Sequence, residues 1–196
     1  MKTRAWHGHR RLQLKMMYGH AYYIEWISEL EAALAKRPGI LQIELIGQGE
    51  VPADSALLIR AILMARSPKT KLVTNARSSL QGGSVLVWLL GDERIIRNDA
   101  RLYFRSVDLP EEAEADGNAW KPSEPKYRDS FSEFDPDDYD YAQVLQVINE
   151  FLPVKELAGR IIRVSLLKQF GLVENENVDS FLANAFGNTS RVLVPQ

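Results

Sequence analysis

The chain has 196 residues, 45% of them hydrophobic and 26% charged, with a net charge of −2. This composition is typical of a single globular domain, and the small net charge excludes a general attraction to nucleic acid or to an anionic membrane. There is no cysteine, which excludes disulfides, thiolate catalysis and cysteine-ligated metals. No apolar stretch reaches the roughly 18 residues of a membrane span, and the basic N-terminus lacks the apolar core of a secretory signal. We therefore expect a cytoplasmic protein.

The first twenty residues are basic and contain all three histidines of the chain. His7 and His9, with His20 as a third ligand, have the residue types of a metal site. Two histidines in a basic arm lack the supporting shell that such a site needs. The sequence therefore favours an arm that contacts a partner, and we expect no metal. Leu12 and Leu14 alternate with polar residues, which predicts a strand.

Residues 21–66 show a regular alternation of helix and strand patterns. An apolar stripe predicts a helix over 21–37, ended by Pro38-Gly39, and a period of two predicts a strand over 40–46. A loop follows over 47–52, and a second helix is expected over 53–66. With the next apolar run, the order predicts a right-handed parallel β-α-β-α-β unit with its ligand site at the carboxyl ends of the strands.

The stretch 71–105 is the centre of this pattern. Leu72 and Val73 predict a buried strand that breaks at 75–79. Gly82-Gly83 then opens a buried helix over 84–90, and two short strands are expected at 94–97 and 101–105. Two glycines at a helix start allow close packing on a sheet, which is the interpretation that spacing alone favours. They also leave backbone N–H groups facing a carboxylate, a phosphate or a developing oxyanion.

Residues 106–140 differ sharply in charge. From Asp108 to Asp140 there are twelve acidic and three basic residues, a net charge of −9, with four prolines. The pattern predicts a solvated loop that can contact a protein partner. Its run Asp135-Pro-Asp-Asp-Tyr-Asp lacks the central glycine and closing glutamate of a calcium loop. Beyond it, apolar spacing predicts helices over 141–152, from Leu157 to about Phe170, and over 178–186. We expect one domain over 1–196: an α/β core with an N-terminal arm (1–105), an acidic loop (106–140) and a helical region (141–196).

Residues 82–104, GGSVLVWLLGDERIIRNDARLYF, resemble the glycine-rich segment of the ClpP/crotonase superfamily. The likeness extends to 40–66 and to Phe170-Gly171-Leu172-Val173. It implies an α/β ββα-superhelix fold with a C-terminal helical region, and a homo-oligomer.

The resemblance to the peptidase branch implies positions for its reactive groups. When the peptidase motif is aligned backwards from Arg94, its catalytic serine falls on Leu80. Its catalytic histidine falls on Arg105, whose guanidinium stays protonated. The glycines of the oxyanion hole fall on Glu50 and Val51. A one-residue shift would put Ser79 at the turn, but no histidine follows residue 20 to serve as its base. Lys71 is the other conceivable base.

The resemblance to the crotonase branch implies a different use of the same turn. Gly83 matches the glycine whose N–H binds the thioester oxygen, while Leu86 replaces the acid/base glutamate of the helix. Glu50 is expected near Gly82-Gly83, either as a new base or, as the charge of a helix start favours, as a cap. The remaining candidate for ligand contact is Ser84. No cofactor is implied beyond a coenzyme A thioester as substrate.

Three main functions remain open at this point, with a serine peptidase as a fourth, lower-ranked one. The residues favour a ClpP/crotonase-like oligomer without peptidase chemistry, working as a binding or structural module. The alternative is an acyl-CoA enzyme of the hydratase or isomerase type that uses the Gly83 N–H; a serine peptidase with a rearranged site ranks below both. The third is a protein that engages a basic partner surface through the acidic loop.

Overall fold

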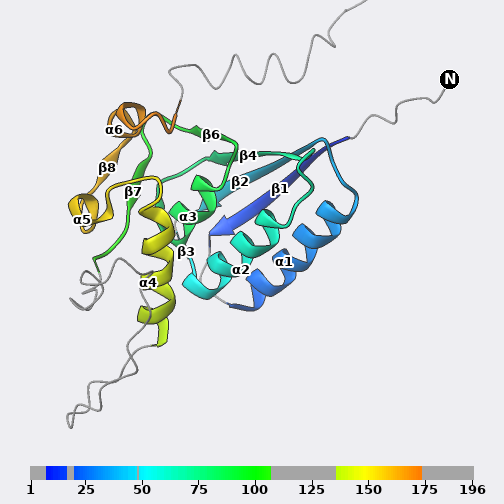
Figure 1. The fold of residues 1–196 in the computed structure, drawn as a ribbon, viewed down its shortest axis with the longest axis horizontal. Coiled ribbons are helices and arrows are strands. Elements are labelled where there is room, and N and C mark those ends of the chain that lie inside the picture. Colours follow the sequence, from blue (N-terminus) through cyan, green and yellow to red (C-terminus); the bar gives the residue numbers. More distant parts are fainter. Residues whose placement is uncertain (1–7, 17–19, 48, 107–135, 174–196) are drawn as a thin grey trace, which may run out of the picture.

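The main sheet contains four parallel strands whose order follows the sequence. The computed structural model describes residues 8–16, 20–47, 49–106 and 136–173 (Figure 1). The strands are β1 (His9–Met16), β2 (Ile40–Gly47), β4 (Lys71–Ala76) and β6 (Glu93–Ile96), in the order β1-β2-β4-β6. Crossovers between parallel strands are right-handed in nearly all proteins, so this order places the connecting helices on one face, as Figure 1 shows. They are α1 (His20–Ala35), α2 (Ala53–Met64) and α3 (Gly83–Leu89).

A second sheet is built from very short strands. It contains β3 (Glu50–Val51), β5 (Leu80–Gly82), β7 (Arg101–Tyr103) and β8 (Ile162–Arg163), in that order. The first three are parallel, and β8 runs antiparallel to β7. Along the chain a long strand of the main sheet, a short strand of the second sheet and a helix follow one another. The expected α/β class with parallel strands is confirmed.

The C-terminal part of the described chain differs from the expected pair of long helices. α4 spans Pro136–Ile148 and packs on α2 and α3. It begins inside the stretch expected to be a loop, because proline is well tolerated at the first helical position. The helix expected from Leu157 onward is wrong: α5 (Val154–Leu157) ends at once, and Gly159, at φ +74°, turns the chain into β8. α6 (Val164–Gln169) then follows.

The break expected at 75–79 is also placed too early. Asn75 and Ala76 continue β4 because β2 pairs with them on one side and β6 on the other. The predicted helix over 178–186, the acidic residues 107–135 and His7 lie outside the described residues. No helix in the described part of the chain is long and apolar enough to cross a membrane.

The core lies between the two sheets and their helices. The largest fully buried side chains are Trp88, Tyr23 and Phe104. Every residue of α3 is buried, which fixes the glycine turn in front of it. The start of α3 is therefore a rigid part of the molecule.

Candidate functional site

The turn from β5 into α3 has Gly82 at its corner. Gly82 has φ 46° and ψ −121°, a backbone conformation that side chains of L-residues rarely adopt. A strand-to-helix turn of this kind holds its corner side chain out from the sheet. A Cβ on Gly82 would overlap the Glu50 carboxylate, and a Cβ on Gly83 would overlap the Val51 carbonyl oxygen. Both positions are thus glycine because β3 passes directly against them.

Glu50 reaches from β3 into the space beside this corner. The Gly83 N–H donates to Glu50 Oε1 at 3.2 Å, so the carboxylate caps the first turn of α3. The backbone of Glu50 is held by Tyr23, whose hydroxyl donates to the Glu50 carbonyl at 3.0 Å. Burial raises the pKa of the half-buried Glu50 carboxyl, while the Gly83 N–H and the Arg105 charge oppose the rise. The volume that a corner side chain would use is filled by a carboxylate from the neighbouring strand.

Arg105 lies just beyond β7, on the same side of the molecule. Its backbone N–H donates to the Tyr141 hydroxyl at 3.0 Å, and its guanidinium carbon stands 4.3 Å from the centre of the Tyr141 ring. Burial raises the pKa of Tyr141 to about 12, so this phenol stays protonated at neutral pH. Arg105 and Tyr141 therefore supply donors and positive charge near Glu50, and neither accepts a proton at neutral pH.

The serines around the turn have structural partners. Ser84 Oγ accepts the Val51 N–H at 2.9 Å and is fully buried. Ser79 Oγ accepts the Arg101 N–H at 3.1 Å, and Ser78 Oγ donates to the Gly47 carbonyl at 2.6 Å. These contacts tie the loop ends to neighbouring strands. None of them joins a serine to a basic side chain.

The other predicted site residues are placed as follows. Leu80 lies inside β5, fully buried, two residues before the corner. The corner is therefore occupied by Gly82 and not by Leu80, because β5 continues to the glycine. Leu86 is buried in α3, and Lys71 Nζ pairs with Glu93 at 2.6 Å, away from the serines. Within the described ranges no three metal-ligating side chains cluster together.

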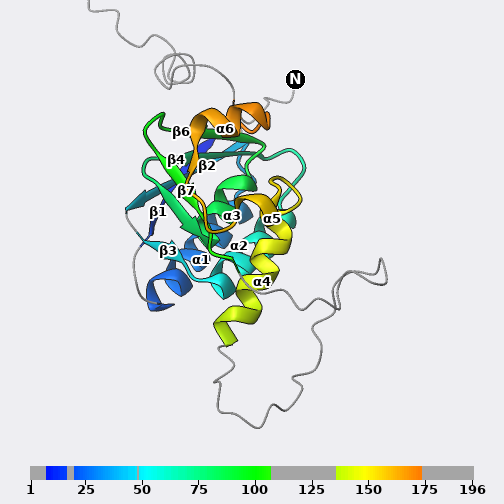
Figure 2. The same cartoon turned by 90° about the vertical axis from the view of Figure 1, so that its left-hand side faces the viewer.

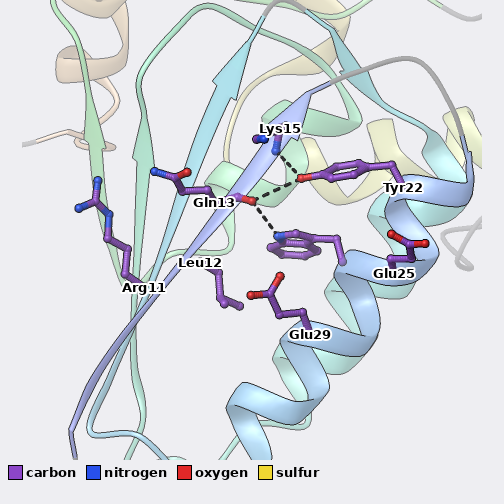
Figure 3. Close-up of a pocket in the computed structure, with 8 residues that line it drawn as sticks. Arg11, Leu12, Gln13, Lys15, Tyr22, Glu25 and Glu29 are labelled. Atoms are coloured by element: carbon purple, nitrogen blue, oxygen red, sulfur yellow. Dashed lines mark hydrogen bonds between the residues drawn. The ribbon is translucent and has the colours of Figure 1, made fainter.

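A separate hollow of about 560 Å³ lies between β1 and α1 (Figure 3). There the backbone N–H of Lys15 donates to the Tyr22 hydroxyl at 2.8 Å, and Trp26 Nε1 donates to the backbone carbonyl of Gln13 at 3.0 Å. These groups belong to the edge of β1 that none of the described strands covers, since β1 is the end strand of its sheet. Side chains of α1 thus occupy an edge that would otherwise pair with another chain.

Two features of the turn were missed from the sequence. The position of the corner depends on a three-residue strand, which has no periodicity to read. Tyr141 was assigned only to a helix, and nothing in its local pattern shows that its hydroxyl reaches the end of β7. The paired glycines were the one signal for close approach of another strand.

Comparison with solved structures shows what this arrangement resembles. A mutant of ClpP1 from Listeria monocytogenes matches with a TM-score of 0.55 at 14% identity, over 87% of this chain and 93% of that chain. The ClpP protease catalytic domain from Plasmodium falciparum matches with a TM-score of 0.55 at 12% identity, over 84% of this chain and 82% of that chain. The chain has a ClpP-like fold. ClpP1 from Listeria monocytogenes itself matches with a TM-score of 0.51 at 12% identity, over 88% and 93% of the two chains.

Sequence comparison adds no relatives to this structural likeness. No family model and no curated protein matches the chain. At identities this low the likeness establishes the ClpP-like fold alone, and the activity has to be argued from the residues at the turn.

Proposed function

We propose that this chain is a ClpP-like protein without serine-peptidase chemistry, working as a non-catalytic binding or structural module in an oligomer. The observation that carries the proposal is the corner of the β5–α3 turn. A glycine stands there, and the Glu50 carboxylate fills the volume that a nucleophilic side chain would need. A nucleophile also needs an adjacent base, and each serine near the turn is engaged with backbone groups instead.

The same contact argues against the acyl-thioester alternative. The backbone donor that would bind a thioester oxygen is the Gly83 N–H, and this N–H donates to Glu50. A thioester would have to displace a carboxylate that is covalently part of the chain and positioned by Tyr23. The geometry therefore supports a filled site more strongly than an open one.

A fluorophosphonate probe tests the proposal directly, because it reacts with activated serines only. The folded full chain should show no labelling above the heat-denatured sample. Coenzyme A thioesters at millimolar concentration should leave Tm unchanged, since a ligand that binds the folded state raises Tm.

Serine variants make the result interpretable. Should the wild-type chain be labelled, Ser79→Ala and Ser84→Ala identify the reactive hydroxyl, and labelling lost in either variant would overturn the proposal. A rise in Tm with the thioester that disappears in Glu50→Ala would instead favour the acyl-thioester enzyme.

A further inference from the structure

The exposed face of the second sheet carries two arginines directly opposite each other. Arg101 on β7 and Arg163 on β8 form an antiparallel cross-strand pair, and both are exposed. Side chains in such a pair have Cβ atoms about 5 Å apart, and like charges in this position destabilise a sheet. Within the described ranges neither guanidinium has a hydrogen-bond or ion-pair partner. Among the residues that the structure describes, no carboxylate therefore offsets the repulsion of the pair.

The surroundings of the pair add positive charge and apolar surface. Arg105 follows β7 and Arg160 precedes β8, and both are exposed. Between them Tyr103 is 39% exposed and Ile161 is 66% exposed. β7 and β8 lie on the side of the molecule away from α1 (Figure 1), and this side faces the viewer in Figure 2. We call the exposed surface of Arg101, Tyr103, Ile161 and Arg163 the arginine face.

The chain itself contains a segment of matching charge. Residues 108–116 begin two positions after Ser106, where the described part of this segment ends, and they contain five acidic residues and no basic one. Nine residues span up to about 30 Å when extended. Arg101 lies five residues before Ser106, at most about 17 Å along the strand. A chain that folds back after Ser106 can therefore reach both arginines.

We propose that residues 108–116 dock on the arginine face of the same chain. Both backbone edges of β7 are already paired, with β5 and β8, so the contact is made through side chains. Carboxylates of the segment accept hydrogen bonds from Arg101 and Arg163, in the planar geometry that suits guanidinium groups, and Leu109 packs on Tyr103 or Ile161. This proposal does not depend on the absence of peptidase chemistry.

Distance measurement between two spin labels tests the docking. The chain has no cysteine, so labels attach only at engineered positions: Ala113→Cys in the segment and Gln81→Cys on β5, which pairs with Tyr103. We expect a short, narrow distance distribution at low salt. The double variant Arg101→Glu/Arg163→Glu should lower the ratio of docked to undocked molecules about tenfold, because it replaces two attractions by repulsions. Sodium chloride at about 0.5 M should act in the same direction.

The controls separate docking from a general charge effect and from a contact between copies. Lys36→Glu/Lys69→Glu makes the same change of net charge at exposed sites before β2 and β4 and should leave the distribution unchanged. A broad, long distribution in the parent pair would overturn the proposal, as would insensitivity to both the arginine reversal and salt. A short distance that vanishes on dilution with excess unlabelled chain would assign the segment to a second copy and would also overturn it. The salt series alters no side chain, so it decides even if the double variant does not fold.

Discussion

Glu50 holds its carboxyl group in a half-buried position, where burial disfavours the charged form relative to water. Burial raises its pKa, and the Gly83 N–H and Arg105 offset the rise only in part. A carboxyl whose pKa is higher in the folded than in the unfolded chain binds its proton more tightly when folded. Its favourable contribution is complete below the unfolded pKa of about 4.3 and is lost as pH rises through the folded value. At neutral pH the charge of Glu50 therefore costs stability.

Glu50→Gln should accordingly raise the free energy of unfolding at pH 7. The amide keeps an acceptor oxygen for the Gly83 N–H but removes the buried charge. We expect a gain of less than about 1 kcal/mol, because the group is partly solvated and the lost attraction to Arg105 opposes the gain. Urea titrations from pH 4 to 8 should show the gain shrinking toward the acid end. Glu31→Gln, at an exposed site on α1, is the control. A loss of stability at pH 7 would mean that the cap outweighs the burial of charge.

The sequence predicted that Glu50 and the paired glycines lie close together, but it did not predict where along the chain the corner of the turn falls. Glu50 was expected near Gly82-Gly83, and it lies there because β3 and β5 are paired, Glu50 opposite Gln81 and Val51 opposite Gly82. Leu80 was assigned to the reactive position because the register was counted from Arg94. The structure places Leu80 at the start of β5, two residues before the glycine corner, and the assignment of the reactive position to Leu80 stays a prediction.

At the scale of elements, the length of a segment decides whether its pattern is visible. α1, α2, β1 and β2 contain enough turns or alternations to show their period, and all were predicted. β3 and β8 have two residues each and β5 has three, so they have no period and exist only because neighbouring strands supply their hydrogen bonds. Of the second sheet only β7 was expected, as a strand over 101–105; the other three strands, and with them the geometry of the site, could not be predicted from local pattern.

The main sheet depends on a buried ion cluster at Glu44 of β2, which is 1% exposed. Arg11 of β1 donates to one of its oxygens, and Arg77, just after β4, donates to the other at 3.0 Å. Burial alone would raise the pKa of Glu44, but the two arginines lower it below its usual value. The pH dependence is therefore opposite to that of Glu50: the stabilisation is present above the unfolded pKa and is lost as pH falls through the folded one.

Glu44→Gln should destabilise the chain by about 2 kcal/mol at pH 7, because it removes the charged acceptor that two partly exposed arginines share. The cost should decrease as pH falls below about 4. Glu93→Gln, which breaks the exposed pair with Lys71 on the same sheet, is the matched control and should cost less than about 1 kcal/mol. Denaturant titrations at pH 3 to 7 measure both. Equal costs for the two variants would show that Glu44 does not hold the strands together.

At the scale of the whole molecule, two helices of the main layer expose large apolar side chains. Ile24 on α1 is 66% exposed, and on α2 Leu58 and Met64 are 50% and 63% exposed. α1 and α2 contact each other, so these exposed side chains lie on neighbouring helices. Burial of exposed apolar side chains between copies is a common basis for oligomers, and the resemblance of residues 82–104 to the ClpP/crotonase superfamily led us to expect a homo-oligomer.

Light scattering on a gel-filtration peak should therefore give a multiple of the 22.2 kDa chain mass. Ile24→Lys/Leu58→Lys should shift the population toward the monomer, because charged side chains disfavour burial. Ile161→Lys changes an equally exposed isoleucine, 66%, on the arginine face and should leave the mass unchanged. A wild-type monomer would contradict the expected assembly, and an oligomer that survives the double change would place the interface elsewhere.

The contact between Glu50 and Gly82 also restricts the order in which substitutions can be tolerated. A side chain introduced at position 82 meets the Glu50 carboxylate, which must then move aside, and it also adopts a positive φ that L-residues rarely accept. Shortening Glu50 removes the first of these two obstacles and leaves the second. Substitutions at position 82 should therefore be tolerated better in a chain that already carries Glu50→Ala, so a library that varies positions 50 and 82 together reaches more folded variants than one that varies position 82 alone.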